Sequence, residues 1–332
     1  MTPSRRTLLK AGSAASLCGL APAAWAQTAW QPTERITYVL GVSPGGSVDT
    51  YARGVQEALT QLKLLNGQNL IIDYKPGGAG IISLQLLQRA AGNAHWLGTF
   101  HTSTLAAIAS GMLKAELRDY PPVAMMVEET QLVAVRADSP LNSGTDLVNA
   151  LRKDVTALRI GVAPALGSGT HLSIARPLKV AGVAIKELTI APFKASSESM
   201  GALLGGHIDV VSATAPVIMP QVAAGKVKVL ASAAPTRGIG PLADIRTWRE
   251  QGVAADFVTY NGVLLPPKMS PEQIRFWEDA LRKVSETAPW KALVEKSGSR
   301  PVFRNHAESM AYMNSELKVI TDLVAELGLA PK

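Results

Sequence analysis

The stretch YVLGVSPGGSVDTYARGVQEAL, residues 38–59, predicts a strand, a glycine-rich turn and a helix in succession. Residues 38–42 form a short apolar run, which is typical of a buried strand. Ser43 and Pro44, followed by two glycines, interrupt this run. An amphipathic helix follows, with Ser47 or Asp49 as its predicted N-cap. This order of elements indicates an α/β fold.

The start of this predicted helix is suited to binding an anion. The first N–H groups of a helix have no partner within the helix, and the helix dipole makes that end positive. The two glycines carry no Cβ, so a ligand can approach their backbone closely. We interpret the turn as half of a carboxylate-binding site, formed by Pro44, Gly45, Gly46, Ser47 and Asp49.

Three other interpretations of this turn compete with an anion site. Residues 41–45 match the G-x-S-x-G pattern of a serine hydrolase, with Ser43 as nucleophile. The oxyanion hole of that motif uses the N–H of the next residue, however, and Pro44 has none. A dinucleotide fingerprint needs three spaced glycines, whereas this turn has two adjacent ones. An ordinary glycine turn remains the structural alternative.

The same order of strand, turn and helix recurs along the chain. Predicted strands at 69–74, 96–100 and 158–163 each precede a turn and a helix, and in open α/β sheets ligands bind at the carboxyl ends of strands. The candidate ligand residues in these turns are Gly78, Ala79, Gly80, Thr102, Ser103, Gly167, Ser168, Gly169, Thr170 and His171. The turn at 77–80 could instead be only a tight connection, and the hydroxyls could be helix caps alone.

Two further polar residues are candidates with a stronger structural alternative. His171 could be a catalytic base, but local spacing puts no nucleophile or carboxylate beside it, so capping or packing is favoured. Asp209 could contact a ligand from the strand predicted at 208–212, although such residues more often cap a turn. Later in the chain we expect a helix at 244–251, a helix opened by a capping box at Ser270, and a final helix beginning at Asn305.

Residues 1–26 have the pattern of an export signal. Arg5 and Arg6 form a twin-arginine motif, an apolar segment follows, and residues 24–26 read Ala-Trp-Ala, which predicts cleavage after Ala26. The only cysteine, Cys18, lies in this segment, so the mature chain would have no disulfide and no thiolate chemistry. Leu17 precedes it, which argues against a lipid anchor. We expect a periplasmic protein.

Composition excludes several functional classes. The chain of 332 residues is 47% apolar and 18% charged, as in globular proteins, and it is long enough for two domains. Removing residues 1–26 lowers the formal net charge from +7 to +4, which suits small anions better than nucleic acid. The histidines lack metal-ligand spacing and no P-loop is present, so we expect no metal, no cofactor and no catalytic residue.

Together these motifs resemble the Bug family, the extracytoplasmic solute receptors of tripartite tricarboxylate transporters. The resemblance covers nearly all of the mature chain and lies in the order and spacing of its segments. They are Pro44-Gly45-Gly46-Ser47-Val48-Asp49 with Arg53, Lys75-Pro76-Gly77-Gly78-Ala79-Gly80, Gly167-Ser168-Gly169-Thr170-His171-Leu172, Leu203-Leu204-Gly205-Gly206-His207-Ile208-Asp209 and Ala224-Gly225-Lys226-Val227.

The resemblance implies a periplasmic-binding-protein fold of type II-like form, in which two α/β domains close on the ligand like a Venus flytrap. We place one domain at 27–125 plus 235–332 and the other at 126–234. Residues 44–49 and 77–80 would line the site from the first domain, and residues 167–171 from the second, with Asp209 nearby. Family members commonly bind carboxylates through backbone N–H groups and hydroxyls.

The sequence therefore predicts a monomeric receptor that captures a small carboxylate and delivers it to membrane permease subunits. Two alternatives stay open. An exported serine hydrolase would use Ser43, or Ser168 with His171. A ligand sensor would have the same fold and report to a sensor kinase of a two-component system.

Overall fold

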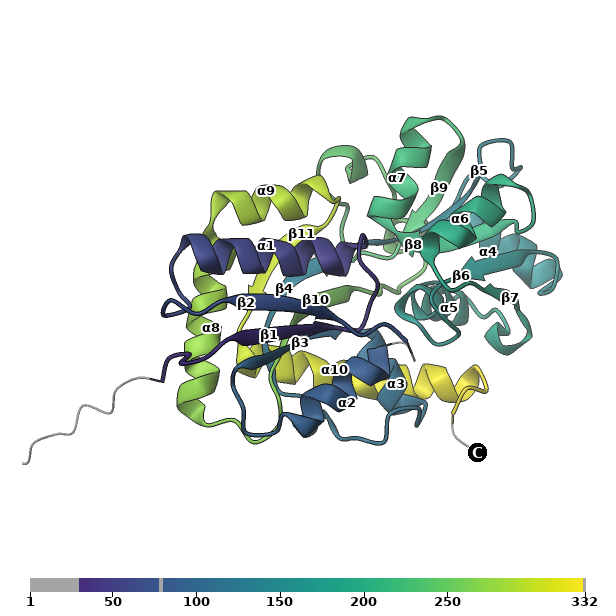
Figure 1. The fold of residues 1–332 in the computed structure, drawn as a ribbon. Helices are drawn as coiled ribbons and strands as arrows, with labels where there is room; N and C mark the ends of the chain where they lie inside the picture. The colour runs from purple at the N-terminus through teal and green to yellow at the C-terminus, as the bar shows by residue number, and fades with distance from the viewer. Residues whose placement is uncertain (1–29, 78–79, 331–332) are drawn as a thin grey trace, which may run out of the picture. The chain divides into compact units, whose positions relative to one another are not determined.

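The structure, a computed structural model, describes residues 30–77 and 80–330 (Figure 1). Residues 31–332 cluster as one compact unit. The predicted signal peptide and the candidate site residues Gly78 and Ala79 lie outside the described residues. Two β-sheets, each combined with helices, make up the fold.

The first sheet has six strands in the order β11-β4-β10-β3-β1-β2. Strand β1 pairs in parallel with β2 and β3, while β10 pairs antiparallel with β3 and β4. The strand bounds are β1 Ile36–Leu40, β2 Leu70–Tyr74, β3 Trp96–His101, β4 Pro122–Glu129, β10 Thr259–Leu264 and β11 Arg300–Arg304. Since β1, β2 and β3 run in the same direction, their carboxyl ends lie at one edge of the sheet.

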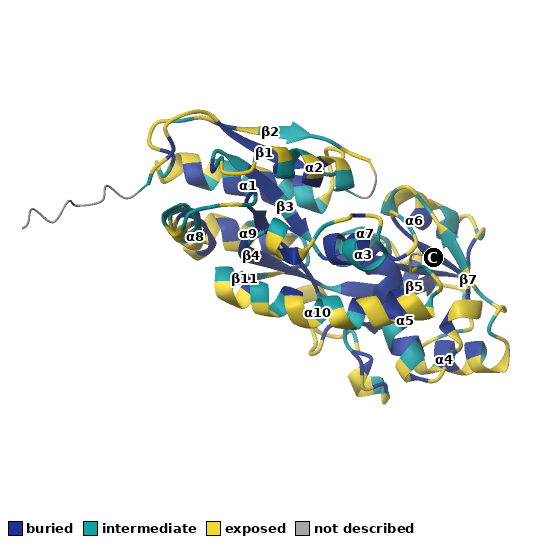
Figure 2. Ribbon diagram, turned by 90° about the horizontal axis from the view of Figure 1, so that it is seen from below, coloured by how far each residue is buried: buried dark blue, intermediate teal, exposed yellow. Residues whose placement is uncertain are grey.

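Six helices accompany this sheet in two groups. Helix α1 packs against α8 and α9, and α3 packs against α10, as Figures 1 and 2 also show. Their sheet-facing sides are buried and their outer sides are exposed, which is the amphipathic pattern that the sequence predicts. The bounds are α1 Ser47–Gln61, α2 Ile81–Arg89, α3 Ser103–Ala109, α8 Pro271–Glu286, α9 Ala288–Lys296 and α10 His306–Glu326.

The second sheet has five strands in the order β7-β6-β8-β5-β9, with β6 parallel to β7 and β8. Its strands are β5 Gln131–Arg136, β6 Arg159–Val162, β7 Thr189–Pro192, β8 Val210–Thr214 and β9 Val227–Ser232. Its helices are α4 Gly144–Lys153, α5 Gly169–Val180, α6 Ser196–Leu204 and α7 Ala215–Ala223. The fold class predicted from the sequence is confirmed by this two-sheet α/β architecture, whose solved neighbours are compared below.

The chain crosses between the two sheets twice, and the crossovers are hydrogen-bonded to each other. The first crossover passes from β4 to β5 at Thr130, and the second returns from β9 to β10 through residues 233–258. The Gln131 side-chain amide donates to the Thr259 hydroxyl at 2.9 Å, and the Ala233 N–H donates to the Gln131 carbonyl at 2.9 Å. The chain therefore passes from the first sheet to the second at residue 130 and returns to the first between residues 232 and 259. The domain boundaries at 125/126 and 234/235 stay a prediction.

The final helix, α10, contacts elements of both sheets, namely α3 and β4 of the first and α5 of the second. Its buried residues Met313, Ile320 and Val324 form an apolar stripe, and they share one hydrophobic cluster with residues of α5. On the polar side, Arg176 of α5 pairs with Glu316 at 3.5 Å, and Lys179 pairs with Glu326. The capping box predicted at Ser270 is present, and Asn305, the predicted start of the last helix, forms a second one.

The prediction of a helix at 244–251 is wrong. Only a 3₁₀ turn at Arg249–Gln251 forms there. The preceding residues pair with the end of β9 instead, because Thr247 forms a parallel bridge with Ser232 and the Trp248 N–H donates to the Ser232 carbonyl at 3.0 Å. Trp248 is fully buried, so tertiary contact outweighs the local helical pattern.

Candidate functional site

Three of the predicted turns follow the carboxyl ends of neighbouring parallel strands. Residues 41–46 follow β1, residues 75–77 follow β2 with Gly80 just before α2, and Thr102 follows β3. Helices α1, α2 and α3 begin directly after these turns. The sheet thus brings the N-termini of three helices to a single edge, which is the arrangement that the sequence predicts for an anion site.

The first two turns are in direct contact. A Cβ added to Gly41 would lie 2.7 Å from the Cα of Gly80 and 2.7 Å from the Ser83 hydroxyl, so the two backbones touch where only glycine fits. Gly80 is the N-cap of α2 and has a φ of 93°, in the left-handed region. This contact places the start of α2 beside the turn that opens α1.

The N-cap of α1 is Gly46, so the expectation of Ser47 or Asp49 as N-cap is wrong. The Asp49 carboxylate lies one turn into the helix and accepts the Gly45 N–H at 2.8 Å. The Gly45 N–H is therefore already hydrogen-bonded within the turn. Among the described residues, no side chain caps the helix at Gly46, and the first N–H groups of α1, at Ser47 and Val48, lack an intrahelical partner.

Asp49 supports the turn through a small polar cluster. Its carboxylate also accepts hydrogen bonds from the Arg53 guanidinium, at 2.9 Å, and from the Tyr74 hydroxyl at the end of β2. Burial raises the pKa of Asp49, but the hydrogen bonds from Tyr74 and Gly45 and the charge of Arg53 together outweigh this effect and hold the pKa below its usual value. Asp49 is therefore an ionised anchor that joins the first turn to β2.

The third turn contains one structural and one pocket residue. Thr102 is fully buried, and its hydroxyl accepts the Tyr260 N–H at 3.2 Å, which joins α3 to β10. The Ser103 hydroxyl lies 2.8 Å from His101 Nδ1, and Ser103 lines the pocket described below. Thr102 is the N-cap residue of α3, but no side chain in the described part of the chain caps this helix. Ligand contact stays a prediction for both residues.

The fourth turn, between β6 and α5, turns its hydroxyls inward. Thr170 donates to the Ala163 carbonyl at 2.6 Å and accepts the Ala163 N–H at 3.1 Å, and Ser168 donates to the same carbonyl at 3.2 Å. Gly169 is buried, and a Cβ there would lie 3.1 Å from the Thr259 methyl group at the crossover. These contacts fix the turn against its own strand, so the two hydroxyls are held by the chain.

His171 serves the same turn. Its Nδ1 accepts the Gly167 N–H at 2.9 Å, so the neutral ring carries its proton on Nε2. Nε2 is buried and has no hydrogen-bond partner among the described residues. Burial lowers the pKa of His171 to about 4. This neutral, inward-facing ring matches the packing role that the sequence favoured.

Asp209 lies away from the other candidates. Its carboxylate pairs with Arg159 at the start of β6, at 3.1 Å, and also accepts the Arg159 N–H at 2.8 Å. The turn at 163–168 follows the opposite end of β6, about 13 Å along the strand. The structure does not bring Asp209 to the predicted ligand edge.

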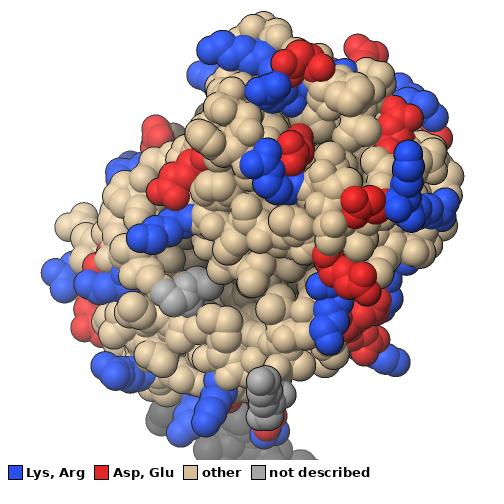
Figure 3. All heavy atoms as spheres, turned by 90° about the vertical axis from the view of Figure 1, so that its right-hand side faces the viewer, with Lys and Arg blue, Asp and Glu red and all other residues tan. Residues whose placement is uncertain are grey.

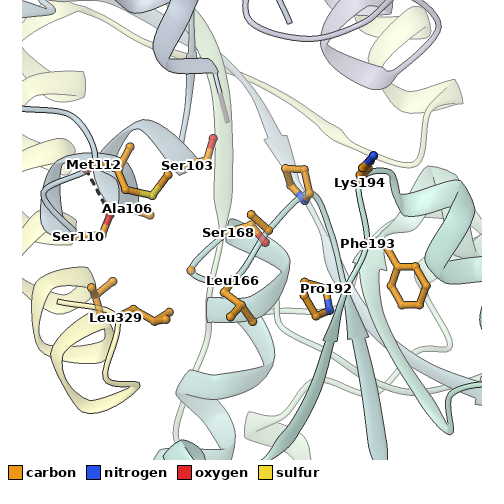
Figure 4. A pocket seen from close by; sticks show the side chains of 15 residues that line it. Ser103, Ala106, Ser110, Met112, Leu166, Ser168, Pro192, Phe193, Lys194 and Leu329 are labelled. Atoms are coloured by element: carbon orange, nitrogen blue, oxygen red, sulfur yellow. Dashed lines mark hydrogen bonds between the residues drawn. The ribbon is translucent and has the colours of Figure 1, made fainter. Parts of the chain in front are cut away.

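A pocket of about 500 Å³ lies beside the third and fourth turns (Figure 4). It brings together three of the predicted residues, Ser103, Gly167 and Ser168. Its other lining residues were not among the sequence candidates, and they are Ala106, Ala107, Ser110, Met112, Pro164, Ala165, Leu166, Pro192, Phe193, Lys194, Val324 and Leu329. The residues after β7 could have been found from sequence, because β7 runs parallel to β6 and ends at the same edge.

Figure 3 shows Lys and Arg intermingled with Asp and Glu over the face that it draws. Within residues 30–77 and 80–330, no group of three or more His, Cys, Asp or Glu side chains is placed to hold a metal ion. In the same part of the chain, no helix has the length and apolar character needed to cross a membrane.

Comparison with known proteins assigns this architecture. Residues 51–329 match the family described as tripartite tricarboxylate transporter family receptor. Among curated proteins, the chain is 25% identical to the UPF0065 protein in the gbd 5′ region of Cupriavidus necator, with 98% of both chains covered. It is 24% identical to Protein BugT of Bordetella pertussis, with 90% of both chains covered.

Solved structures share the fold at low sequence identity. The periplasmic binding protein BugD superposes with a TM-score of 0.74 at 20% identity, covering 91% of this chain and 100% of that one. Rhodopseudomonas palustris Rpa4515 with adipate superposes with a TM-score of 0.77 at 23% identity, covering 91% of this chain and 99% of that one. MatC from the same organism, with bound malate, superposes with a TM-score of 0.74 at 22% identity, covering 88% of this chain and 99% of that one.

Proposed function

The chain belongs to the family of tripartite tricarboxylate transporter receptors, which are periplasmic solute-binding proteins, and on this premise we propose that it captures a small carboxylate at the turns that open α1 and α2. The ligand is bound without chemical change and is delivered to the membrane subunits of a transporter. Export through the twin-arginine signal in residues 1–26, with cleavage after Ala26, belongs to the same proposal.

The observation that carries this proposal is the contact between Gly41 and Gly80. It supports a site in which two helix N-termini present backbone N–H groups to one anion. A carboxylate has two oxygens, each able to accept more than one hydrogen bond, so it suits such paired donors. Two of the similar structures, MatC with bound malate and Rpa4515 with adipate, are consistent with this ligand class.

The second sheet would complete the site. The turn at 163–168 lines the pocket together with Ser103 at the start of α3, and Lys194 adds a positive charge. We propose that binding draws the two sheets together about the paired crossovers, which adds contacts and excludes water. In this proposal Pro44, Gly46, Ser47, Gly80, Ser103, Gly167 and Ser168 face the ligand. Asp49, Thr102, Thr170 and His171 hold the turns in place.

A thermal-shift experiment tests the proposed function. The purified protein is heated with mono-, di- and tricarboxylic acids, aliphatic and aromatic, and each acid is then recovered and analysed. We expect at least one acid to raise the melting midpoint in a concentration-dependent way, since a ligand that binds only the folded state stabilises it by mass action. That acid should be recovered unchanged. Conversion of the acid, or a panel without any shift, would contradict the proposal.

A further inference from the structure

The pocket beside the third and fourth turns has a lining that consists mostly of hydrocarbon. Figure 4 shows Met112, Ala106 and Leu329 on one side of it and Leu166 on the other. Val324, Pro164 and Pro192 add further apolar surface. At about 500 Å³ the pocket falls within the range of small-molecule sites.

The polar groups of the lining are few, and most are already paired. The Ser103 hydroxyl is bonded to His101, the Ser110 hydroxyl donates to the Ala107 carbonyl at 3.3 Å, and the Ser168 hydroxyl donates to the Ala163 carbonyl. Lys194 is the only charged side chain among the described residues that line the pocket. The side chains of the lining thus offer one cation and few free groups that could bind a hydroxyl in the middle of a ligand.

Two of the lining residues expose large apolar side chains. Met112 is 57% exposed and Leu166 is 42% exposed, and both rank among the most exposed large hydrophobic residues that the structure describes. Covering such surface with hydrocarbon is favourable by about 25 cal/mol per Å². A ligand hydroxyl placed against the same surface would lose its water without gaining a partner, which is unfavourable.

We infer that the ligand is a carboxylic acid with a hydrocarbon body, whose body lies against Met112 and Leu166 and for which Lys194 supplies charge to an acid group. This inference rests on the proposed function and narrows its ligand class. Acids of equal size and charge that carry hydroxyls along the body are bound more weakly, because the lining leaves those hydroxyls unpaired.

Matched pairs of acids test this selectivity by calorimetric titration of the purified protein. Adipate and galactarate have the same chain length and charge and differ in four hydroxyls. Benzoate and gallate form the corresponding aromatic pair. We expect the hydrocarbon member of at least one pair to bind at least tenfold more tightly than its hydroxylated partner. Equal or tighter binding of the hydroxylated member in both pairs would overturn the inference.

A pair of leucine variants connects the selectivity to the pocket. Leu166→Asn should reduce the affinity for the preferred hydrocarbon acid at least tenfold. Leu62→Asn is the matched control, because Leu62 is 41% exposed and lies at the far end of α1, about 22 Å from its start. The control should bind like the unmodified chain. Equal loss in both variants, or loss in neither, would also overturn the inference.

The remaining outcomes separate the two proposals. If both pairs fail to bind while a hydroxylated acid such as citrate binds tightly, the protein is a carboxylate receptor and the inferred ligand class is wrong. If no acid binds at all, the proposed function fails as well.

Discussion

Gly41 and Gly80 lie so close together that a Cβ on Gly41 would stand 2.7 Å from the Cα of Gly80. The two residues are 39 positions apart in sequence and belong to turns after neighbouring parallel strands. Their contact sets the spacing between the starts of α1 and α2. It is therefore the part of the fold on which the proposed carboxylate site most depends.

Substitution of Gly41 should disturb both the fold and the site. We expect Gly41→Ala to lower the free energy of unfolding by about 1–3 kcal/mol, because the added methyl group must displace backbone atoms of the second turn. Carboxylate affinity should fall with it. Gly46→Ala is the control, since a Cβ at Gly46 meets nothing within 4 Å. Denaturant unfolding of both variants measures the difference, and equal stability of the two would count against a tight contact between the turns.

A larger side chain at Gly46 should separate binding from stability. Gly46 has a φ of −91° and open space around it, so Gly46→Leu should unfold within about 0.5 kcal/mol of the unmodified chain. The leucine would stand over the first N–H groups of α1, and carboxylate affinity should fall at least about tenfold. Gly201→Leu, which also has open space, should leave affinity unchanged. Full affinity of the Gly46 variant would exclude this turn as a ligand contact.

The crossovers should depend on the hydrogen bond between Gln131 and Thr259. Thr259→Val keeps the shape of the side chain but leaves the buried Gln131 amide without its acceptor, at a cost of about 1–3 kcal/mol in the free energy of unfolding. Thr321→Val provides an exposed control on α10 and should cost less. Chemical denaturation compares the two. An equal effect would mean that this hydrogen bond does little to join the crossovers.

His171 should make stability depend on pH. Its pKa falls from 6.5 in the unfolded chain to about 4 in the folded protein, so the folded state binds its proton less readily. The free energy of unfolding is therefore unaffected by this titration above pH 6.5, and it falls by about 3 kcal/mol as the pH drops from 6.5 towards 4. His171→Gln removes the titrating ring, and its oxygen can still accept the Gly167 N–H. Unfolding curves between pH 7 and 4 should show a smaller loss in the variant, whereas parallel curves would contradict the assignment.

The sequence predicts the turns of the site because strand, turn and helix signals are local. The apolar run before Ser43 and the glycines after it are enough to position α1, and the same logic applies to α2, α3 and α5. Parallel pairing then gathers the turns at one edge. The prediction of Ser47 or Asp49 as the N-cap of α1 was incorrect. Asp49 lies within the helix, where its carboxylate accepts hydrogen bonds from the Gly45 N–H and the Tyr74 hydroxyl.

The rest of the site depends on contacts between distant parts of the chain. Met112 and Leu329 carry no local signal for ligand binding, and only the folded chain brings them to the same pocket. Asp209 shows the reverse, since its position before β8 puts it at the end of the sheet away from the turns, where it pairs with Arg159. A residue next to a strand is a ligand candidate only at the strand's carboxyl end.

The most direct test of the carboxylate claim compares the tightest-binding acid of the panel with its own primary amide. The two molecules have nearly the same shape, and only the acid carries the negative charge that helix N-termini and Lys194 would bind. Calorimetric titration of the purified protein should show the amide binding at least about tenfold more weakly. Equal affinity for acid and amide would contradict a receptor that recognises its ligand by the carboxylate.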